Sequence, residues 1–171
     1  SVPALVDLHE QMLQSIQQLR TYCETLKPPL LYQMGIHIAL ERLAEKMQVN
    51  ADFTLRTTFD RLYIENEQLL LSIYRIVQEL LHNAVKHANA TTVEVSVLET
   101  EDGIEVYYTD DGVGCDVRTF DQSESFGIYG IQERVLALNG EITVQTSPNA
   151  GFTMQILLKE GALSYDNHTN H

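Results

Sequence analysis

The sequence lacks several features by which common protein classes are recognised. It has no run of about 18 uninterrupted apolar residues, so no segment is expected to span a membrane as a helix. No signal peptide is visible at its start, and we find no internal repeat or low-complexity segment. No GxGxxG motif joins a strand to a helix, which excludes a Rossmann fold.

Cysteine and positive charge are also scarce. The two cysteines, Cys23 and Cys115, are isolated, which excludes a disulfide framework or zinc motif and indicates a reducing, cytosolic compartment. Eleven Lys and Arg against 24 Asp and Glu give a net charge of −13. We therefore expect no direct nucleic-acid binding, which needs a basic surface. A bound polyanion would need a metal ion, helix N-termini or a few positioned cations.

The N-terminal segment has a heptad-like apolar pattern that predicts a helix over 4–26. Such a helix needs a partner helix to bury its stripe. Lys27, Pro28 and Pro29 end it, because proline removes a donor and disfavours helix in the preceding residue. The apolar residues of the stripe are Leu5, Leu8, Met12, Ile16, Leu19, Cys23 and Leu26.

The rest of the chain alternates helical and strand patterns. Asn66 is the expected N-cap of the longest helix, and residues 101–103 form a hairpin turn. The tail, 161–171, is polar and expected to be disordered. This order predicts a two-layer α/β sandwich with a mixed, mainly antiparallel sheet. Helices are predicted over 30–47, 67–88 and 128–138, and strands over 51–59, 91–99, 104–110, 141–146 and 152–158.

The segment ELLHNAVKHA, residues 79–88, carries polar residues within a helical pattern. On a helix Glu79, Asn83, Lys86 and His87 share one face. Asparagine is a poor helix former, so its place in mid-helix needs a reason. Taken alone, this segment is either a solvated stripe or one wall of a binding site.

Two glycine-containing segments follow. Asp110 ends a strand and can accept a hydrogen bond from an exocyclic amine, while Gly112 and Gly114 allow close approach of the backbone to a ligand. Gly127 and Gly130 bracket the start of a helix, whose backbone N–H groups can hold phosphate oxygens. An acidic turn and a glycine-rich helix start are the structural alternatives.

A fourth segment, Gly151 to Thr153, opens the last strand. Together the four segments resemble the ATP-binding (Bergerat) domain shared by sensor histidine kinases, type II topoisomerases, heat-shock chaperones and mismatch-repair ATPases. They match its N box, G1 box, G2 box and final Gly-Thr segment in order, and the resemblance covers roughly residues 30–160. It implies binding of ATP and Mg²⁺ in a two-layer α/β sandwich.

The histidine-kinase branch fits best, and this resemblance implies a role for each residue of the N box. Asn83 would coordinate Mg²⁺, and Lys86 and His87 would approach the phosphates. Glu79 would orient or deprotonate the attacking group. Asp110, in the G1 box, would read the amino group of adenine.

The same resemblance implies roles for the glycines and the threonine. Gly112 and Gly114 would shape the pocket, and Gly127 and Gly130 would lie at the phosphate end of a mobile lid. Thr153 would support the adenine through its hydroxyl.

The segments KPPLL, 27–31, and GIQERV, 130–135, resemble the nitrate-sensor and lipid-thermosensor type of kinase. That type has a short lid and pairs with response regulators that carry helix-turn-helix output domains. The chain departs from the family at Ser125, where the G2 box usually has a glycine, which puts the shape of the lid in doubt.

His9, in the motif DLHE, resembles the phosphorylated histidine of this kinase type. The family acceptor lies on the first of two long antiparallel helices, however, and a single helix precedes the proline stop. We therefore expect the acceptor to lie upstream, with residues 1–29 as part of a dimerisation helix that makes the full protein a homodimer. A surface histidine is the favoured interpretation of His9.

The leading hypothesis is thus the catalytic ATP-binding domain of a sensor histidine kinase, the cytoplasmic part of a membrane-anchored sensor. Two alternatives remain. One is an ATPase of the same superfamily that drives dimer closure and activates water with Glu79. The other is a non-catalytic nucleotide-binding or partner-docking module.

Overall fold

The computed structural model describes Met12, Ser15, residues 28–115 and residues 127–159. The expected helix over 4–26, apart from helical Met12 and Ser15, lies outside the described residues. So do His9, Ser125 and the tail.

The described chain forms a five-stranded sheet in the order β1-β2-β3-β5-β4. The β1–β2 pair is parallel and the other three pairs are antiparallel. This arrangement confirms the predicted mixed, mainly antiparallel sheet. The strands are β1 (Thr54–Phe59), β2 (Thr92–Thr100), β3 (Gly103–Asp110), β4 (Glu141–Thr146) and β5 (Phe152–Leu158).

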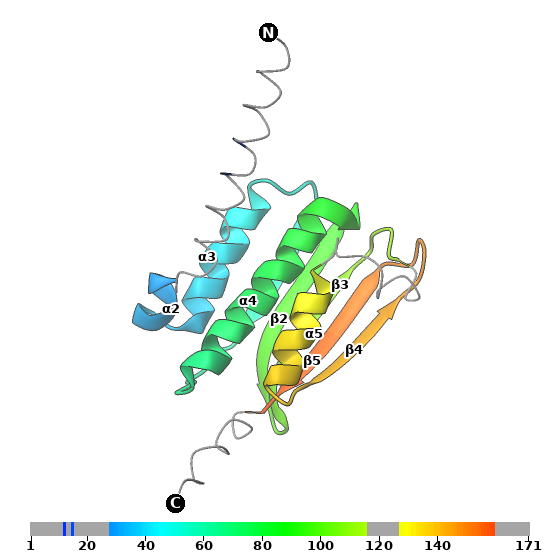
Figure 1. The fold of residues 1–171 in the computed structure, drawn as a ribbon. Helices are drawn as coiled ribbons and strands as arrows, with labels where there is room; N and C mark the ends of the chain where they lie inside the picture. The colour runs from blue at the N-terminus through cyan, green and yellow to red at the C-terminus, as the bar shows by residue number, and fades with distance from the viewer. Residues whose placement is uncertain (1–11, 13–14, 16–27, 116–126, 160–171) are drawn as a thin grey trace, which may run out of the picture.

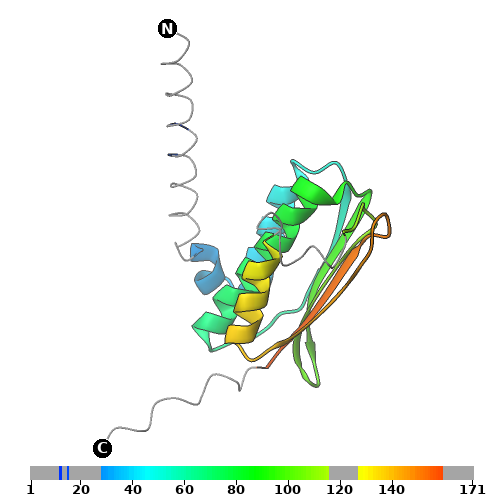
Figure 2. The same cartoon turned by 45° about the vertical axis from the view of Figure 1, so that its right-hand side comes forward.

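The helices α3, α4 and α5 lie side by side over one face of this sheet (Figures 1 and 2). Apolar residues of α4 meet inward residues of the strands, and the core between the two layers is closely packed: Ile73, Ile76, Val77, Val95 and Ile156 are fully buried. The predicted two-layer sandwich is therefore confirmed. The helices are α2 (Pro29–Gln33), α3 (Ile36–Gln48), α4 (Glu67–Asn83) and α5 (Ile128–Ala137).

The single helix predicted over 30–47 is wrong in one respect, because the structure divides it into α2 and α3. Gly35 lies between them with φ +89, a backbone conformation that interrupts a right-handed helix and favours glycine. Leu31 and Ile36, on either side of the break, are both buried. The break thus turns the chain while keeping both helices on the core.

The long helix begins as predicted and ends differently. The side chain of Asn66 accepts a hydrogen bond from the amide of Leu69 at 3.0 Å, the expected N-cap. After Asn83 the last turn is a π-helix, η1 (Ala84–Ala88), which Asn89 ends in the left-handed conformation at φ +46. π-turns widen a helix and are frequent at functional sites.

The loop after β3 is held between this helix end and the β4–β5 turn. Val113 donates from its backbone to the carbonyl of Ala88 at 2.9 Å, and Gly151 donates to the carbonyl of Gly112 at 3.0 Å. An ideal Cβ at Gly112 would lie 1.9 Å from the oxygen of Ala88, so glycine is required for this close approach. The loop is therefore fixed beside the C-terminal end of η1.

Candidate functional site

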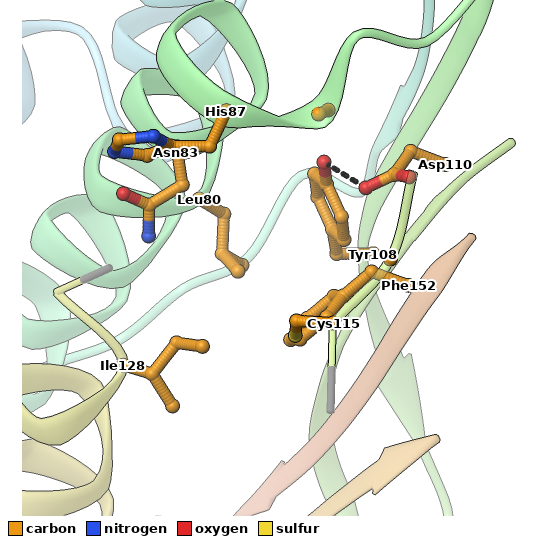
Figure 3. A pocket seen from close by; sticks show the side chains of 10 residues that line it. Leu80, Asn83, His87, Tyr108, Asp110, Cys115, Ile128 and Phe152 are labelled. Carbon is orange, nitrogen blue, oxygen red and sulfur yellow. Dashed lines mark hydrogen bonds between the residues drawn. The ribbon is translucent and has the colours of Figure 1, made fainter. Parts of the chain in front are cut away.

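A cavity of about 440 Å³, including its open mouth, lies between the helical layer and the sheet. Figure 3 shows two facing walls, one from α4, η1 and α5 and one from β3, β5 and the loop after β3. The residues that line it are Leu80, Asn83, His87, Ala88, Tyr108, Asp110, Gly114, Cys115, Ile128 and Phe152.

The helical wall carries Asn83 and His87, whose side chains lie next to each other above Leu80 (Figure 3). The spacing of three and four residues places these side chains on one stripe of α4 and η1. Both polar side chains are half-buried, while Leu80 is 2% exposed. This wall thus offers an amide and an imidazole at the upper part of the cavity, above an apolar floor.

The sheet wall carries a fixed carboxylate. Oδ2 of Asp110 accepts a hydrogen bond from the hydroxyl of Tyr108 at 2.6 Å, and Oδ1 accepts one from the amide of Gly112 at 2.9 Å. A carboxylate has about four lone-pair sites, so acceptor capacity remains toward the cavity. Asp110 can therefore accept a hydrogen bond from an amino group of a ligand.

Apolar groups surround this carboxylate. The rings of Tyr108 and Phe152 meet edge to face with centroids 6.0 Å apart. Cys115 and Ile128 line the same space, and the amide of Cys115 is held at 3.0 Å by the hydroxyl of Thr146. Ligand sites of this kind, mostly apolar with a few placed polar groups, suit a flat heterocycle.

Glu79 lies in a separate hollow between α4 and α5, of about 550 Å³ with its open side. Gly127, the N-cap of α5 at φ +61, lies under its carboxyl group, since an ideal Cβ there would be 1.7 Å from Oε1 of Glu79. Gly130 also borders this hollow, and Arg75 and Arg134 add two cations. The described structure therefore places Glu79, Gly127 and Gly130 together, next to the cavity rather than in its lining.

Three other predicted site residues do not line the cavity. Lys86 is exposed on η1, and Gly112 contacts Ala88 at the edge. The hydroxyl of Thr153 makes a 2.8 Å hydrogen bond with that of Thr109, its partner across β3 and β5. Because strand side chains alternate, Thr153 faces away from the side to which Phe152 points. The structure thus brings together Asn83, His87, Asp110 and Gly114.

Two lining residues outside the motifs, Tyr108 and Phe152, could have been predicted from the alternation of side chains along their strands. Ile104, Val106, Tyr108 and Asp110 alternate with outward residues along β3, so Tyr108 had to share a face with Asp110. The same alternation of Phe152 with buried Met154 in β5 pointed to Phe152. No comparable signal marks Cys115 or Ile128.

Within the described residues, no group of three or more His, Cys, Asp or Glu is placed to hold a metal ion by itself. Mg²⁺ is usually bound by one or two protein oxygens plus phosphate oxygens and water. The amide of Asn83 at the cavity supplies an oxygen of this hard type (Figure 3). The donor set therefore fits a metal ion that arrives with a nucleotide.

Comparison with known proteins identifies the class. Residues 69–162 match the family described as histidine kinase-, DNA gyrase B-, and HSP90-like ATPase, and the chain belongs to this family. The cavity, its carboxylate and its glycines thus lie in an ATP-binding domain, and the family expected from the four motifs is confirmed.

Particular relatives are sensor histidine kinases. Sensor histidine kinase ComP of Bacillus subtilis (strain 168) is 39% identical over 154 residues, which cover 89% of this chain and 20% of ComP. The histidine-protein kinase/phosphatase DegS of Brevibacillus brevis is 30% identical over 154 residues, covering 88% and 39%. The chain thus spans about a fifth to two fifths of the length of these relatives.

Solved structures agree on the fold. The histidine kinase domain of the Erythrobacter litoralis EL346 blue-light activated kinase superposes with a TM-score of 0.66 at 17% identity, covering 77% of this chain and 66% of that one. At this identity the likeness supports the fold alone. None of the helices in the described part of the chain has the length and apolar character needed to cross a membrane.

Proposed function

We propose that this chain is the catalytic ATP-binding domain of a two-component sensor histidine kinase, which transfers the γ-phosphate of ATP to a histidine. The observation that carries the proposal is the fixed carboxylate of Asp110 in an apolar slot, facing Asn83 and His87 across the cavity. A carboxylate accepts from the 6-amino group of adenine, and the polar helical wall lies where the phosphates would extend.

The residues divide the task. Asp110 accepts from the amino group of the base, which lies against Phe152 and Tyr108 on the sheet wall, and Asn83 would supply an oxygen to Mg²⁺. A bound Mg²⁺ would offset negative charge on the phosphate oxygens of the nucleotide. His87, and Lys86 from its exposed position, approach the phosphates. Gly112 and Gly114 shape the pocket beside the base, and Gly127 and Gly130 lie at the phosphate end of the site, next to Glu79.

Glu79 acts on the acceptor in this proposal. A neutral imidazole nitrogen of the acceptor attacks the γ-phosphorus, the bond to the bridging oxygen breaks, and ADP leaves. Glu79 accepts a hydrogen bond from the other ring N–H, which orients the ring and favours release of its proton. The hollow between α4 and α5 that contains Glu79 is open on one side, so the acceptor approaches through this hollow in the proposal.

The proposal extends to the whole protein. A response regulator with a helix-turn-helix output domain receives the phosphoryl group, and a homodimer forms through the helix within residues 1–29. Residues 30–160 form the catalytic domain of a membrane-anchored sensor whose catalytic part is cytoplasmic. Thr153, whose hydroxyl is bonded to Thr109, contributes to the adenine site through the strand that carries Phe152.

Isothermal titration calorimetry with ATP and Mg²⁺ tests the site. We expect the wild-type chain to bind, Asp110→Ala to lose most of the affinity, and Asn83→Ala to lose the dependence on Mg²⁺. Asp102→Ala, in the exposed β2–β3 turn, is the matched acidic control and should bind as the wild type. Absence of binding by the wild type, or unchanged binding by Asp110→Ala, contradicts the proposal.

Transfer from radiolabelled ATP separates the kinase from its alternatives. Supplied with a separate histidine-bearing dimerisation domain, the chain should form an acid-labile phosphate on that domain, and Glu79→Gln should not. Dimer-stimulated ATP hydrolysis without such a product would favour the ATPase alternative. The chain alone should not phosphorylate itself stably, and an acid-labile phosphate on His9 would show that prediction to be wrong.

A further inference from the structure

The hydrogen bond between Tyr108 and Asp110 links a buried phenol to the carboxylate that reads the base (Figure 3). Tyr108 is 3% exposed, and its ring packs against Phe152. The preceding inward residues of β3, Ile104 and Val106, are aliphatic and buried. The strand thus changes from aliphatic side chains to a tyrosine at the point where the sheet reaches the cavity, and only the tyrosine can donate a hydrogen bond.

The phenol is a permanent donor. Burial first, and then the charge and the hydrogen bond of Asp110, raise the pKa of Tyr108 well above its ordinary value of 10.0. The hydroxyl therefore keeps its proton at physiological pH, and its single hydrogen is directed to Oδ2 of Asp110 at 2.6 Å.

The carboxylate is consequently held at both oxygens. The amide of Gly112 fixes Oδ1 at 2.9 Å and the phenol fixes Oδ2, so rotation of the carboxyl group would break at least one hydrogen bond. The remaining lone pairs then point in fixed directions, and an amino group of the base meets an acceptor that needs no reorganisation. Fixing a group in its binding geometry before the ligand arrives increases affinity and selectivity.

We propose that Tyr108 is a positioning residue for base selectivity: its hydroxyl holds Asp110 so that the site prefers a purine with a 6-amino group over one with a 6-oxo group. This inference rests on the proposed nucleotide site and specifies how it distinguishes ATP from inosine or guanosine nucleotides. A 6-oxo group would place two acceptors face to face, whereas the 6-amino group donates to the carboxylate.

Calorimetry with ATP and with inosine triphosphate tests the inference in three chains. The variant is Tyr108→Phe, which keeps the ring and removes one oxygen. The matched control is Tyr107→Phe, the same change at the next residue, which points to the opposite face of β3. Thermal unfolding of each chain verifies that the fold is retained.

We expect the wild type to prefer ATP, and Tyr108→Phe to bind ATP about tenfold more weakly, since a hydrogen bond to a charged group contributes on this order. Its affinity for inosine triphosphate should stay as in the wild type, so the preference falls by the same factor. Tyr107→Phe should match the wild type for both nucleotides. If Tyr108 has only a structural role, Tyr108→Phe should bind both nucleotides more weakly by the same factor, and this result would overturn the inference. Unchanged or tighter binding of ATP by Tyr108→Phe would overturn it as well.

A double-mutant cycle with Asp110→Asn provides a second test. If the hydroxyl acts through the carboxylate, Tyr108→Phe should not change the preference further in the Asp110→Asn chain, and an undiminished change would overturn the inference. The same experiment distinguishes failure of the proposed function from failure of this inference. If the wild type binds neither nucleotide, the proposed function and the selectivity are both contradicted. If it binds ATP and inosine triphosphate equally, only the selectivity is contradicted.

Discussion

Replacing Gly112 by alanine should destabilise the fold, because the glycine loop touches the end of η1. The added Cβ would lie 1.9 Å from the carbonyl oxygen of Ala88 and 2.8 Å from its carbonyl carbon. Both are backbone atoms, so no side chain can rotate away and the loop itself must move. That movement would strain the hydrogen bonds from Val113 to Ala88 and from Gly151 to Gly112.

Overpacking by one carbon costs about 1–3 kcal/mol in well-packed sites, and we expect about 2 kcal/mol for Gly112→Ala. For a chain of this size, each kcal/mol lowers Tm by about 2–4 °C, so Tm should fall by about 4–8 °C. Urea titration followed by circular dichroism measures the free energy of unfolding, with an unchanged m-value as evidence that the two-state comparison holds.

Gly130→Ala is the matched control. Apart from its chain neighbours and the backbone of its own helix, no described atom lies within 4 Å of a Cβ added at Gly130, and the residue lies within α5. Alanine in a helix is about 0.5–1 kcal/mol more favourable than glycine, so this variant should be as stable as the wild type or slightly more stable. If Gly112→Ala has the same free energy of unfolding as the wild type, or if both variants lose stability equally, the loop does not approach η1 this closely in the folded protein.

Two further predictions concern other parts of the site. Gly127→Ala adds a Cβ at φ +61, and this strained backbone conformation costs about 1 kcal/mol. The Cβ also displaces the carboxyl group of Glu79, so phosphotransfer should fall while calorimetry shows that ATP binding is retained. Equal phosphotransfer by the variant and the wild type would contradict this prediction. The hydroxyl of Thr91, followed by the amides of Thr92 and Thr91, lowers the pKa of Asp111 from its ordinary 3.8. Because the folded pKa is depressed, the stabilisation is fully present above the ordinary 3.8 and is lost as pH falls through the lower folded pKa. The Tm advantage over Asp111→Asn should therefore be constant at neutral pH and shrink as pH falls below the ordinary 3.8, and a difference that stays constant there would refute the linkage.

Segments with strong local signals were predicted closely from the sequence. β4 and β5 have the expected bounds, because alternating apolar residues end at turn residues on both sides. The N-cap by Asn66 is likewise a local interaction, between residues three apart. The family resemblance predicted that Asn83 and Asp110 lie at one site, and both line the same cavity. No local pattern predicts this, because the two residues come together only through the packing of α4 on β3.

Features that depend on the tertiary structure were missed. Periodicity runs unbroken through Gly35, and the division into α2 and α3 depends on a positive φ that glycine permits but does not require. The π-turn at η1 similarly leaves no mark on hydrophobic spacing. The side chain of Thr153 lies on the face of β5 opposite to Phe152, where it pairs with Thr109, and the role at the adenine that the family resemblance implies for it stays a prediction.

The helix α4 borders both the cavity proposed to bind the base and the hollow proposed to receive the acceptor histidine. Residues 80 and 83 border the cavity with the sheet wall, whereas residues 75, 79 and 82 border the hollow with α5. These stripes lie on adjacent faces of one helix. Under the proposed function, the base would contact β3 and β5, and the acceptor would contact α4 and α5. Tyr108→Phe should therefore lower the preference for ATP and leave the transfer of the phosphoryl group unchanged. Gly127→Ala should lower phosphotransfer and leave the preference for ATP unchanged. Measuring both properties in both variants tests this independence, and a loss of base preference in Gly127→Ala would show that the two faces of α4 are coupled.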